Sequence, residues 1–308
     1  MGIAEVIPGI SGGTIAFITG IYTELLDNIH AVLTLFKRDL PNRRALQTID
    51  WVFLGSLLAG MIVGIGFGIS AVIHLLERYP PAVWAFFFGL ILGSAVLIAR
   101  HTEVHKLKYL VPLLLAAVLA WIITQSTALP LKPHPLYIFA SGALAVMALV
   151  LPGISGSYIL LLLGMYFFII EDTLKGLFAE PSAQKFFHLF VFGAGALLGL
   201  ATIVRLLHHF IHRYKKTVMA LLTGFVLGSL GKIWPWKNPV QWLDTTSGKI
   251  MHGIPPIGAD FKIIYSQNVL PSQYYDMPYF GLSLWSFLLG LAVVYLLYRY
   301  APPSQDSP

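Results

Sequence analysis

The sequence Pro-Gly-Ile-Ser-Gly occurs twice in this chain, at residues 8–12 and 152–156. Each copy interrupts an apolar stretch. Proline removes a backbone donor and clashes with the preceding turn, while glycine permits a sharp reversal of the chain. We therefore expect a helix, a break and a second helix in each place, over residues 3–14 and 148–158.

Such a break can bind an anion. Ser11 and Ser155 are suited to cap the helix that follows, and a helix N-terminus offers free amides and about half a positive charge to a phosphate. Gly12 and Gly156 would let the anion approach the backbone closely. The predicted substrate-binding residues are Ser11, Gly12, Gly13, Thr14, Ser155, Gly156, Ser157 and Tyr158, and the turns are shaped by Pro8, Gly9, Pro152 and Gly153. The alternative is a kink that only packs helices closely.

A few other polar residues lie in apolar surroundings. Glu5 could bind a coupling ion beside the first motif, or lie near the membrane interface. Arg205 could attract a lipid phosphate, or extend to the headgroups. His208 and His212 have the i, i+4 spacing of a metal pair, but the sequence shows no third ligand. We therefore predict no metal and no cofactor. Transport could be coupled to a proton or sodium gradient.

The composition is that of a membrane protein. Of the 308 residues, 57% are hydrophobic and 11% are charged, whereas a soluble domain carries about 25% charged residues. The net charge of +6 is explained by basic cytoplasmic loops, so we expect no nucleic-acid partner. The absence of cysteine excludes disulfides and thiolate metal sites. These features exclude a soluble enzyme.

We expect an all-α polytopic membrane protein built from two repeats. A helix needs about 20 apolar residues to cross a bilayer. Repeat 1 (residues 1–129) has a re-entrant hairpin at 1–26 and spans near 51–76, 82–99 and 109–127. Repeat 2 (130–300) has a hairpin at 136–170 and spans near 186–211, 218–234 and 280–298, before a tail at 301–308. The leading arm of the first hairpin is short, so we expect the natural start to lie upstream of Met1.

Internal similarity carries the repeat assignment. At an offset of 144, the first motif matches the second motif residue for residue over Pro-Gly-Ile-Ser-Gly. At an offset of 135, the residues Val83, Ala85, Gly89, Leu92, Gly93 and Ser94 match Val218, Ala220, Gly224, Leu227, Gly228 and Ser229.

Three spans in each repeat would turn the second copy upside down, and the charges test that inversion. One side would hold eleven basic residues, namely Lys37, Arg38, Arg43, Arg44, Arg100, Lys106, Lys108, Arg213, Lys215, Lys216 and Arg299. The short loops of the other side hold four, namely Arg78, Lys132, Lys175 and Lys185. The richer side is expected to be cytoplasmic.

Residues 1–22 and 151–166 resemble a bacterial membrane family that was long catalogued as a domain of unknown function. That family is now linked to transport of undecaprenyl phosphate, a polyprenyl carrier lipid recycled in cell-wall synthesis. The resemblance implies a lipid transporter or flippase of the bacterial cytoplasmic (inner) membrane, whose partner is polyprenyl phosphate and which could form a homo-oligomer. The family usually has Asp where this chain has Glu5.

Two rival functions remain open at this point. A membrane lipid-phosphate phosphatase or phosphotransferase would also need a phosphate site, together with a nucleophile or an acid–base pair. The hydrophilic loops offer no dense cluster of such residues, so we expect no enzyme. An anion channel is the other rival.

The charge count predicts a topology that single-cysteine labelling can test, because the native chain has no cysteine. Cysteine placed at residue 247 should react from outside the cell, and cysteine within residues 100–108 should react only from the cytoplasm. Labelling of residue 247 from the cytoplasm alone would contradict the inverted arrangement.

Overall fold

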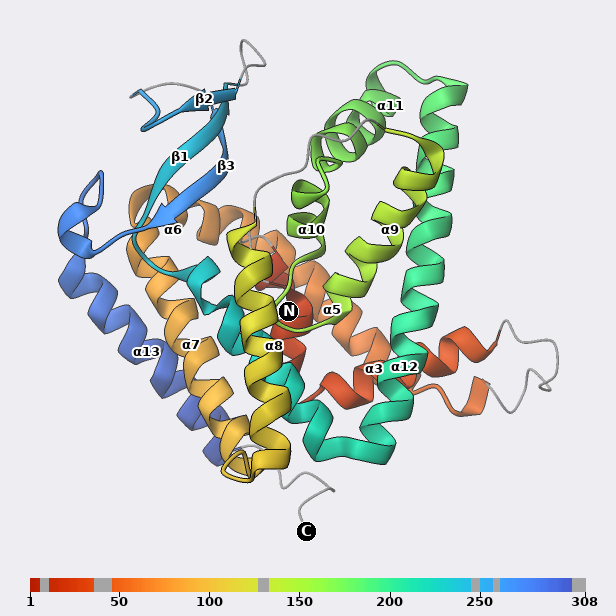
Figure 1. The fold of residues 1–308 in the computed structure, drawn as a ribbon, viewed down its shortest axis with the longest axis horizontal. Coiled ribbons are helices and arrows are strands. Elements are labelled where there is room, and N and C mark those ends of the chain that lie inside the picture. Colours follow the sequence, from red (N-terminus) through yellow and green to blue (C-terminus); the bar gives the residue numbers. More distant parts are fainter. Residues whose placement is uncertain (6–10, 36–45, 127–132, 245–249, 257–260, 301–308) are drawn as a thin grey trace. The chain divides into compact units, whose positions relative to one another are not determined.

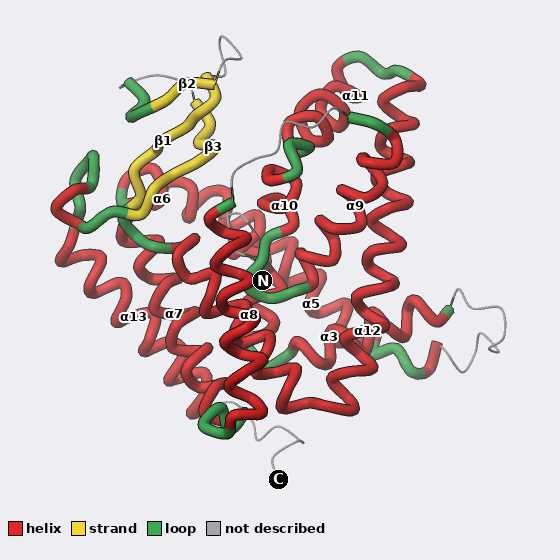
Figure 2. The backbone as a smooth tube through the Cα atoms, viewed as in Figure 1, coloured by secondary structure: helices red, strands yellow, loops and turns green. Residues whose placement is uncertain are grey.

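The computed structural model describes residues 1–5, 11–35, 46–126, 133–244, 250–256 and 261–300, and most of them are helical (Figures 1 and 2). Four helical runs among these residues are long and apolar enough to cross a membrane, in agreement with a multi-pass protein. They are α7 (Pro80–His101), α8 (Leu107–Gln125), the run Ala183–Ile233 that contains α12 (Ala183–Ser229), and α13 (Phe280–Tyr300). The chain divides into two compact units, described separately below.

The first unit comprises residues 1–73 and 95–229. Besides α8 and α12 it contains α1 (Gly2–Glu5), α2 (Gly12–Ile18), α3 (Tyr22–Thr34), α5 (Trp51–Phe67), α9 (Pro135–Val150), α10 (Gly156–Leu162) and α11 (Gly176–Ala179). There are two π-helical stretches. Gly68–Val72 follows α5, and Phe167–Lys175 precedes α11. The segments Gly156–Leu162 and Phe167–Ala179 are bent by 113° and together have the length and composition of a broken span or re-entrant loop.

Glycine allows α12 to pack closely against both α9 and α8. A Cβ atom at Gly195 would lie 2.0 Å from the carbonyl oxygen of Phe139 on α9. A Cβ atom at Gly224 would lie 2.1 Å from the carbonyl oxygen of Leu113 on α8. Small residues permit such backbone contact between membrane helices, where van der Waals packing rather than water exclusion drives association.

The helical run α12 consists of two helices that meet at a kink, at the place where the spans near 186–211 and 218–234 were predicted to be separated. The kink is at Tyr214, whose backbone leaves the helical region (φ −136°, ψ 47°). Near this kink, Glu103 bonds with both Lys106 and Lys216 at 2.5 Å. These two hydrogen bonds hold the pKa of the Glu103 carboxyl near 2, well below its usual range. The segments 100–108 and 213–217, predicted to share one side of the membrane, are thus directly connected.

The second unit comprises residues 74–94 and 230–308. It holds most of α6 (Ile73–Arg78), the first part of α7, the 3-10 helices Leu230–Ile233 and Pro271–Gln273, and α13. Glycines again bring two helices close together. A Cβ atom at Gly89 would lie 2.3 Å from the carbonyl oxygen of Phe287, and one at Gly290 would lie 2.2 Å from that of Phe86.

An antiparallel sheet was not anticipated by the all-α prediction. Its strands are β1 (Lys237–Asp244), β2 (Ile250–His252) and β3 (Phe261–Asn268), in the order β2-β1-β3. They occupy the segment that was predicted to be a long loop between the last two spans (Figure 2). The pairing of β1 with β3 shifts register between Pro239 and Gln241. Apart from this sheet, the prediction of a mostly helical membrane protein is confirmed.

Replacing Gly224 by leucine should destabilise the first unit, because the new side chain would collide with the backbone of α8. Overpacking of this kind costs about 1–3 kcal/mol or more. The matched control is Gly193→Leu on the same helix, where a Cβ atom meets nothing within 4 Å. In detergent, the midpoint of thermal unfolding should be lower for Gly224→Leu than for the parent chain, and unchanged for the control. Equal midpoints for the two variants would contradict the close contact.

Candidate functional site

The structure interrupts a helix at the second motif (Figure 1). In the second motif α9 ends at Val150, Gly153 adopts a positive φ of 90°, and α10 begins at Gly156. In the first motif α1 ends at Glu5 and α2 begins at Gly12. Pro8 and Gly9 lie outside the described residues. The predicted pattern of helix, break and helix is confirmed for the second motif.

The two motifs, 144 residues apart in the sequence, are hydrogen-bonded to each other. The Gly153 amide donates to Thr14 Oγ1 over 2.9 Å. Ser11 Oγ donates to the Leu149 carbonyl over 3.3 Å. The hydroxyl of Tyr22, the first residue of α3, donates to the Val150 carbonyl over 3.0 Å. The first motif therefore binds the end of the helix that leads into the second motif.

These bonds satisfy groups that the break in the helix leaves without partners. No amide within a helix donates to its last four carbonyls, so those that are buried need a donor from elsewhere. Ser11 and Thr14 are each only 3% exposed, as is Tyr22. Ser11 Oγ also accepts the Gly13 amide over 3.2 Å, so its predicted role as N-cap of α2 is confirmed.

Ser155 behaves differently from Ser11. It occupies the N-cap position of α10 with extended backbone angles, but its side chain makes no capping hydrogen bond. Ser155 Oγ instead lies 2.8 Å from Ser157 Oγ. Ser157 is exposed and Ser155 is half-buried, which leaves this pair of hydroxyls accessible at the start of α10. The Tyr158 hydroxyl donates to the Thr124 carbonyl at the end of α8 over 3.0 Å.

Packing gives another reason for two of the motif glycines. A Cβ atom at Gly156 would lie 2.5 Å from the Ala145 carbonyl, and one at Gly13 would lie 2.9 Å from the Leu149 carbonyl. The sequence analysis explained Gly156 by close approach of an anion. In the structure, close approach of α9 requires glycine there, so a bulky residue at this position would disturb the fold itself.

Comparison with known proteins identifies the family of the chain. Residues 1–251 match the model of a family described as undecaprenyl phosphate translocase-like. The chain belongs to this family. A relative in Vibrio cholerae serotype O1, named polyprenyl-phosphate transporter, is 36% identical over 98% of this chain and 94% of its own length. A relative of the same name in Staphylococcus aureus is 28% identical over 79% of this chain and 86% of its own length. No solved structure matches the chain.

In this translocase-like chain, the other predicted residues take no part in the three hydrogen bonds that involve the motifs. Glu5 is the last residue of α1. Arg205 is exposed on α12. His208 and His212 lie on α12 beside Asp27 of α3. The sequence analysis missed Asp27, because nothing in the residue spacing links it to a pair of histidines on a distant helix.

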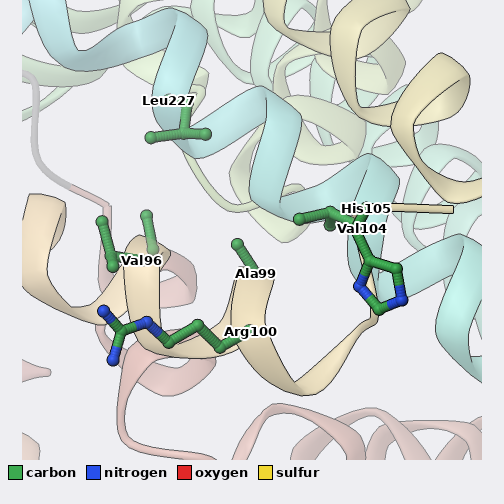
Figure 3. Close-up of a pocket in the computed structure, with 7 residues that line it drawn as sticks. Val96, Ala99, Arg100, Val104, His105 and Leu227 are labelled. Carbon is green, nitrogen blue, oxygen red and sulfur yellow. The ribbon is translucent and has the colours of Figure 1, made fainter.

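A cavity of 420 Å³ also lies in the first unit (Figure 3). Its wall is mostly apolar, with Arg100 and His105 as the polar members. The lining residues are Ala95, Val96, Ala99, Arg100, Val104, His105 and Leu227. None of the residues predicted to bind phosphate lines it, so the cavity and the tips are different features of the translocase-like fold.

Removal of the Tyr22 hydroxyl tests the contact between the motifs. Tyr22→Phe keeps the ring and leaves the Val150 carbonyl without this donor, which should cost about 0.5–1.5 kcal/mol. We expect a lower midpoint of thermal unfolding in detergent. Tyr295→Phe, a change at an exposed position of α13, is the control and should leave the midpoint unchanged. The contact is refuted if both variants unfold at the temperature of the parent chain.

Proposed function

We propose that this chain carries polyprenyl phosphate across the bacterial cytoplasmic membrane, with the phosphate bound at the two broken-helix tips and the prenyl tail left in lipid. The relatives named polyprenyl-phosphate transporter support the substrate class. The observation that carries the site is the contact between the motifs, in which the Gly153 amide bonds to Thr14. Broken helices that meet inside a membrane protein are where transporters bind substrate.

Within this proposal the residues of the tips divide into two groups. Ser11 and Thr14 hold the tips together, as their burial and hydrogen bonds indicate. Ser155 and Ser157 offer accessible hydroxyls at the start of α10, where the first amides of a helix have no partner within it. A phosphate placed there would receive hydrogen bonds without a nearby cation or metal.

Inverted repeats would provide the change of access, with residues 1–129 and 130–300 as the two halves. Gly89 and Gly224 are equivalent at the offset of 135. Gly89 packs on Phe287 of α13, the last helix of the second half, while Gly224 packs on Leu113 of α8, the last span of the first half. This reciprocal exchange is what a two-fold relation produces. With the charge count, it supports halves that rock against each other.

Coupling to a proton or sodium gradient belongs to the same proposal. Glu5, at the end of α1 beside the first motif, is the residue through which an ion would act. A carboxylate in a membrane segment costs free energy, and such residues usually mark a functional site.

Purified protein in liposomes should move undecaprenyl phosphate between leaflets at a saturable rate. The double variant Ser155→Ala, Ser157→Ala should lose most of this rate, since a hydrogen bond to a charged group contributes about 1.5–3 kcal/mol. The control is Ser56→Ala, an exposed hydroxyl on α5. Reconstituted amounts must be equal for all three proteins. A normal rate in the double variant would overturn the phosphate site. Release of inorganic phosphate would indicate an enzyme, and unsaturable flux a channel.

A further inference from the structure

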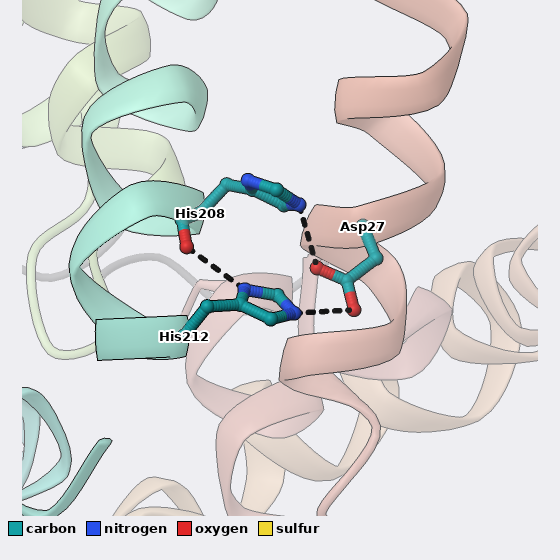
Figure 4. Close-up of side chains that lie close together, drawn as sticks. All are labelled: Asp27, His208 and His212. Atoms are coloured by element: carbon teal, nitrogen blue, oxygen red, sulfur yellow. Dashed lines mark hydrogen bonds and ion pairs between the residues drawn. The ribbon is translucent and has the colours of Figure 1, made fainter. Parts of the chain in front are cut away.

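Three side chains that could bind a metal lie between α3 and α12 (Figure 4). His208 and His212 are one turn apart on α12 and therefore share a face. Asp27 on α3 faces both of them. One potential ligand atom from each residue lies within 4.8 Å of the other two. This cluster shares no residue with the phosphate site proposed above.

The distances suit a metal ion better than direct hydrogen bonds. Asp27 Oδ1 lies 3.6 Å from His208 Nε2, and Asp27 Oδ2 lies 3.8 Å from His212 Nε2. A charge-assisted hydrogen bond would be about 2.7–2.9 Å long. Ligands about 2.0–2.1 Å from a tetrahedral zinc ion are about 3.3 Å from one another. A small contraction of the cluster would therefore place all three atoms around one ion.

The hydrogen bond of His212 determines which of its two ring nitrogens carries the proton. His212 Nδ1 lies 2.9 Å from the carbonyl oxygen of His208, and since a carbonyl can only accept, Nδ1 carries a proton. In the neutral ring Nε2 then presents a lone pair to the carboxylate, which is repulsive unless a cation lies between them. A histidine whose second nitrogen donates to a backbone carbonyl is typical of metal ligands.

Two further observations concern Asp27 and His208. Asp27 Oδ1 is inaccessible to solvent and accepts no hydrogen bond from any described residue, a costly state for a carboxylate oxygen. The ring of His30 stacks on that of His208, with centroids 4.0 Å apart and planes 6° apart, which restrains the orientation of His208. The side chains of His208, Asp27 and His212 are 32%, 40% and 54% exposed, so an ion could enter and bind a further ligand from solvent.

We propose that Asp27, His208 and His212 form a binding site for one divalent transition metal of the zinc class. Two imidazoles and a carboxylate favour zinc, copper, iron or nickel over magnesium or calcium, which prefer oxygen ligands. The metal would join α3 to α12. Tyr22 of α3 donates a hydrogen bond to the end of α9, and α12 packs against α9. A metal that joins α3 to α12 would therefore stabilise the two helices that contact α9, the helix leading into the second motif.

The test uses the full chain, purified in detergent, with any affinity tag removed and bound metal stripped by a chelator. Cobalt(II) is titrated and its visible absorption is followed; the chain has no cysteine, so thiolate cannot contribute to the spectrum. We expect one cobalt ion per chain in a four- or five-coordinate spectrum, displaced by one equivalent of zinc. Asp27→Asn and His212→Gln should each weaken binding at least tenfold.

The matched control is His209→Gln, which removes an exposed histidine of the same helix outside the cluster and should bind as the parent chain does. Zinc at about one hundred times its dissociation constant should raise the midpoint of thermal unfolding by roughly 5 °C in the parent and the control. It should leave Asp27→Asn unchanged. The proposal is overturned if the parent binds no cobalt stoichiometrically, or if both cluster variants bind it as tightly as the parent. The cluster would then be an ion pair between protonated histidine and Asp27.

Discussion

A helix that breaks inside a membrane exposes backbone groups that lipid cannot satisfy, and this constraint explains the arrangement around the two motifs. α9 ends with the carbonyls of Leu149 and Val150, which receive hydrogen bonds from Ser11 and Tyr22. The amide of Gly153 in the turn is received by Thr14. The break after α9 is tolerated because the first motif and Tyr22 supply partners for its backbone groups, so the two motifs meet within the first unit.

Glycine makes this meeting geometrically feasible. The helices that carry and support the second motif approach one another to backbone contact, where Gly156 of α10 and Gly195 of α12 each meet α9. A methyl group at either position would collide with a backbone carbonyl of α9. The hydrogen bonds between the motifs and the glycine contacts therefore depend on each other. Rearranging one requires rearranging the other.

Hydropathy alone predicted the long helices well. The span expected near residues 109–127 is α8, Leu107–Gln125, and that near 82–99 is α7, Pro80–His101. Long apolar runs determine such helices without reference to distant residues. The separation of the spans near 186–211 and 218–234 was predicted as well, because charged residues lie between them, and two helices meet there at the kink of Tyr214.

The sheet was missed for a physical reason that its register explains. Pro239 lies within β1, the central strand, and proline argues against a central strand because it cannot donate to the ladder. In the structure Pro239 pairs only with β3, beside a shift in register, and β2 pairs with residues 241–243 beyond it. Pro239 therefore lies in the part of β1 that pairs with β3 alone. No local pattern in the sequence distinguishes this situation from a loop.

The candidate site shows the same division between local and distant information. The cap at Ser11 follows from residue type and position, and the sequence predicted it. The partners of Thr14 and Tyr22 are more than one hundred residues away, as are the histidines that face Asp27, and spacing carries no information about them. Ser155 shows that even a repeated motif can use the same residue differently, because its neighbour Ser157 offers a competing hydroxyl where the first motif has Gly13.

The strength of the contact between the motifs bears on how a carrier of this design could work. Each neutral hydrogen bond contributes about 0.5–1.5 kcal/mol, so the three bonds together hold the tips with only a few kcal/mol. A phosphate oxygen is a stronger acceptor than the Thr14 hydroxyl, because hydrogen bonds to ionised groups are roughly twice as strong as neutral ones. The Gly153 amide therefore has, in the Thr14 hydroxyl, a weaker partner than an ionised acceptor.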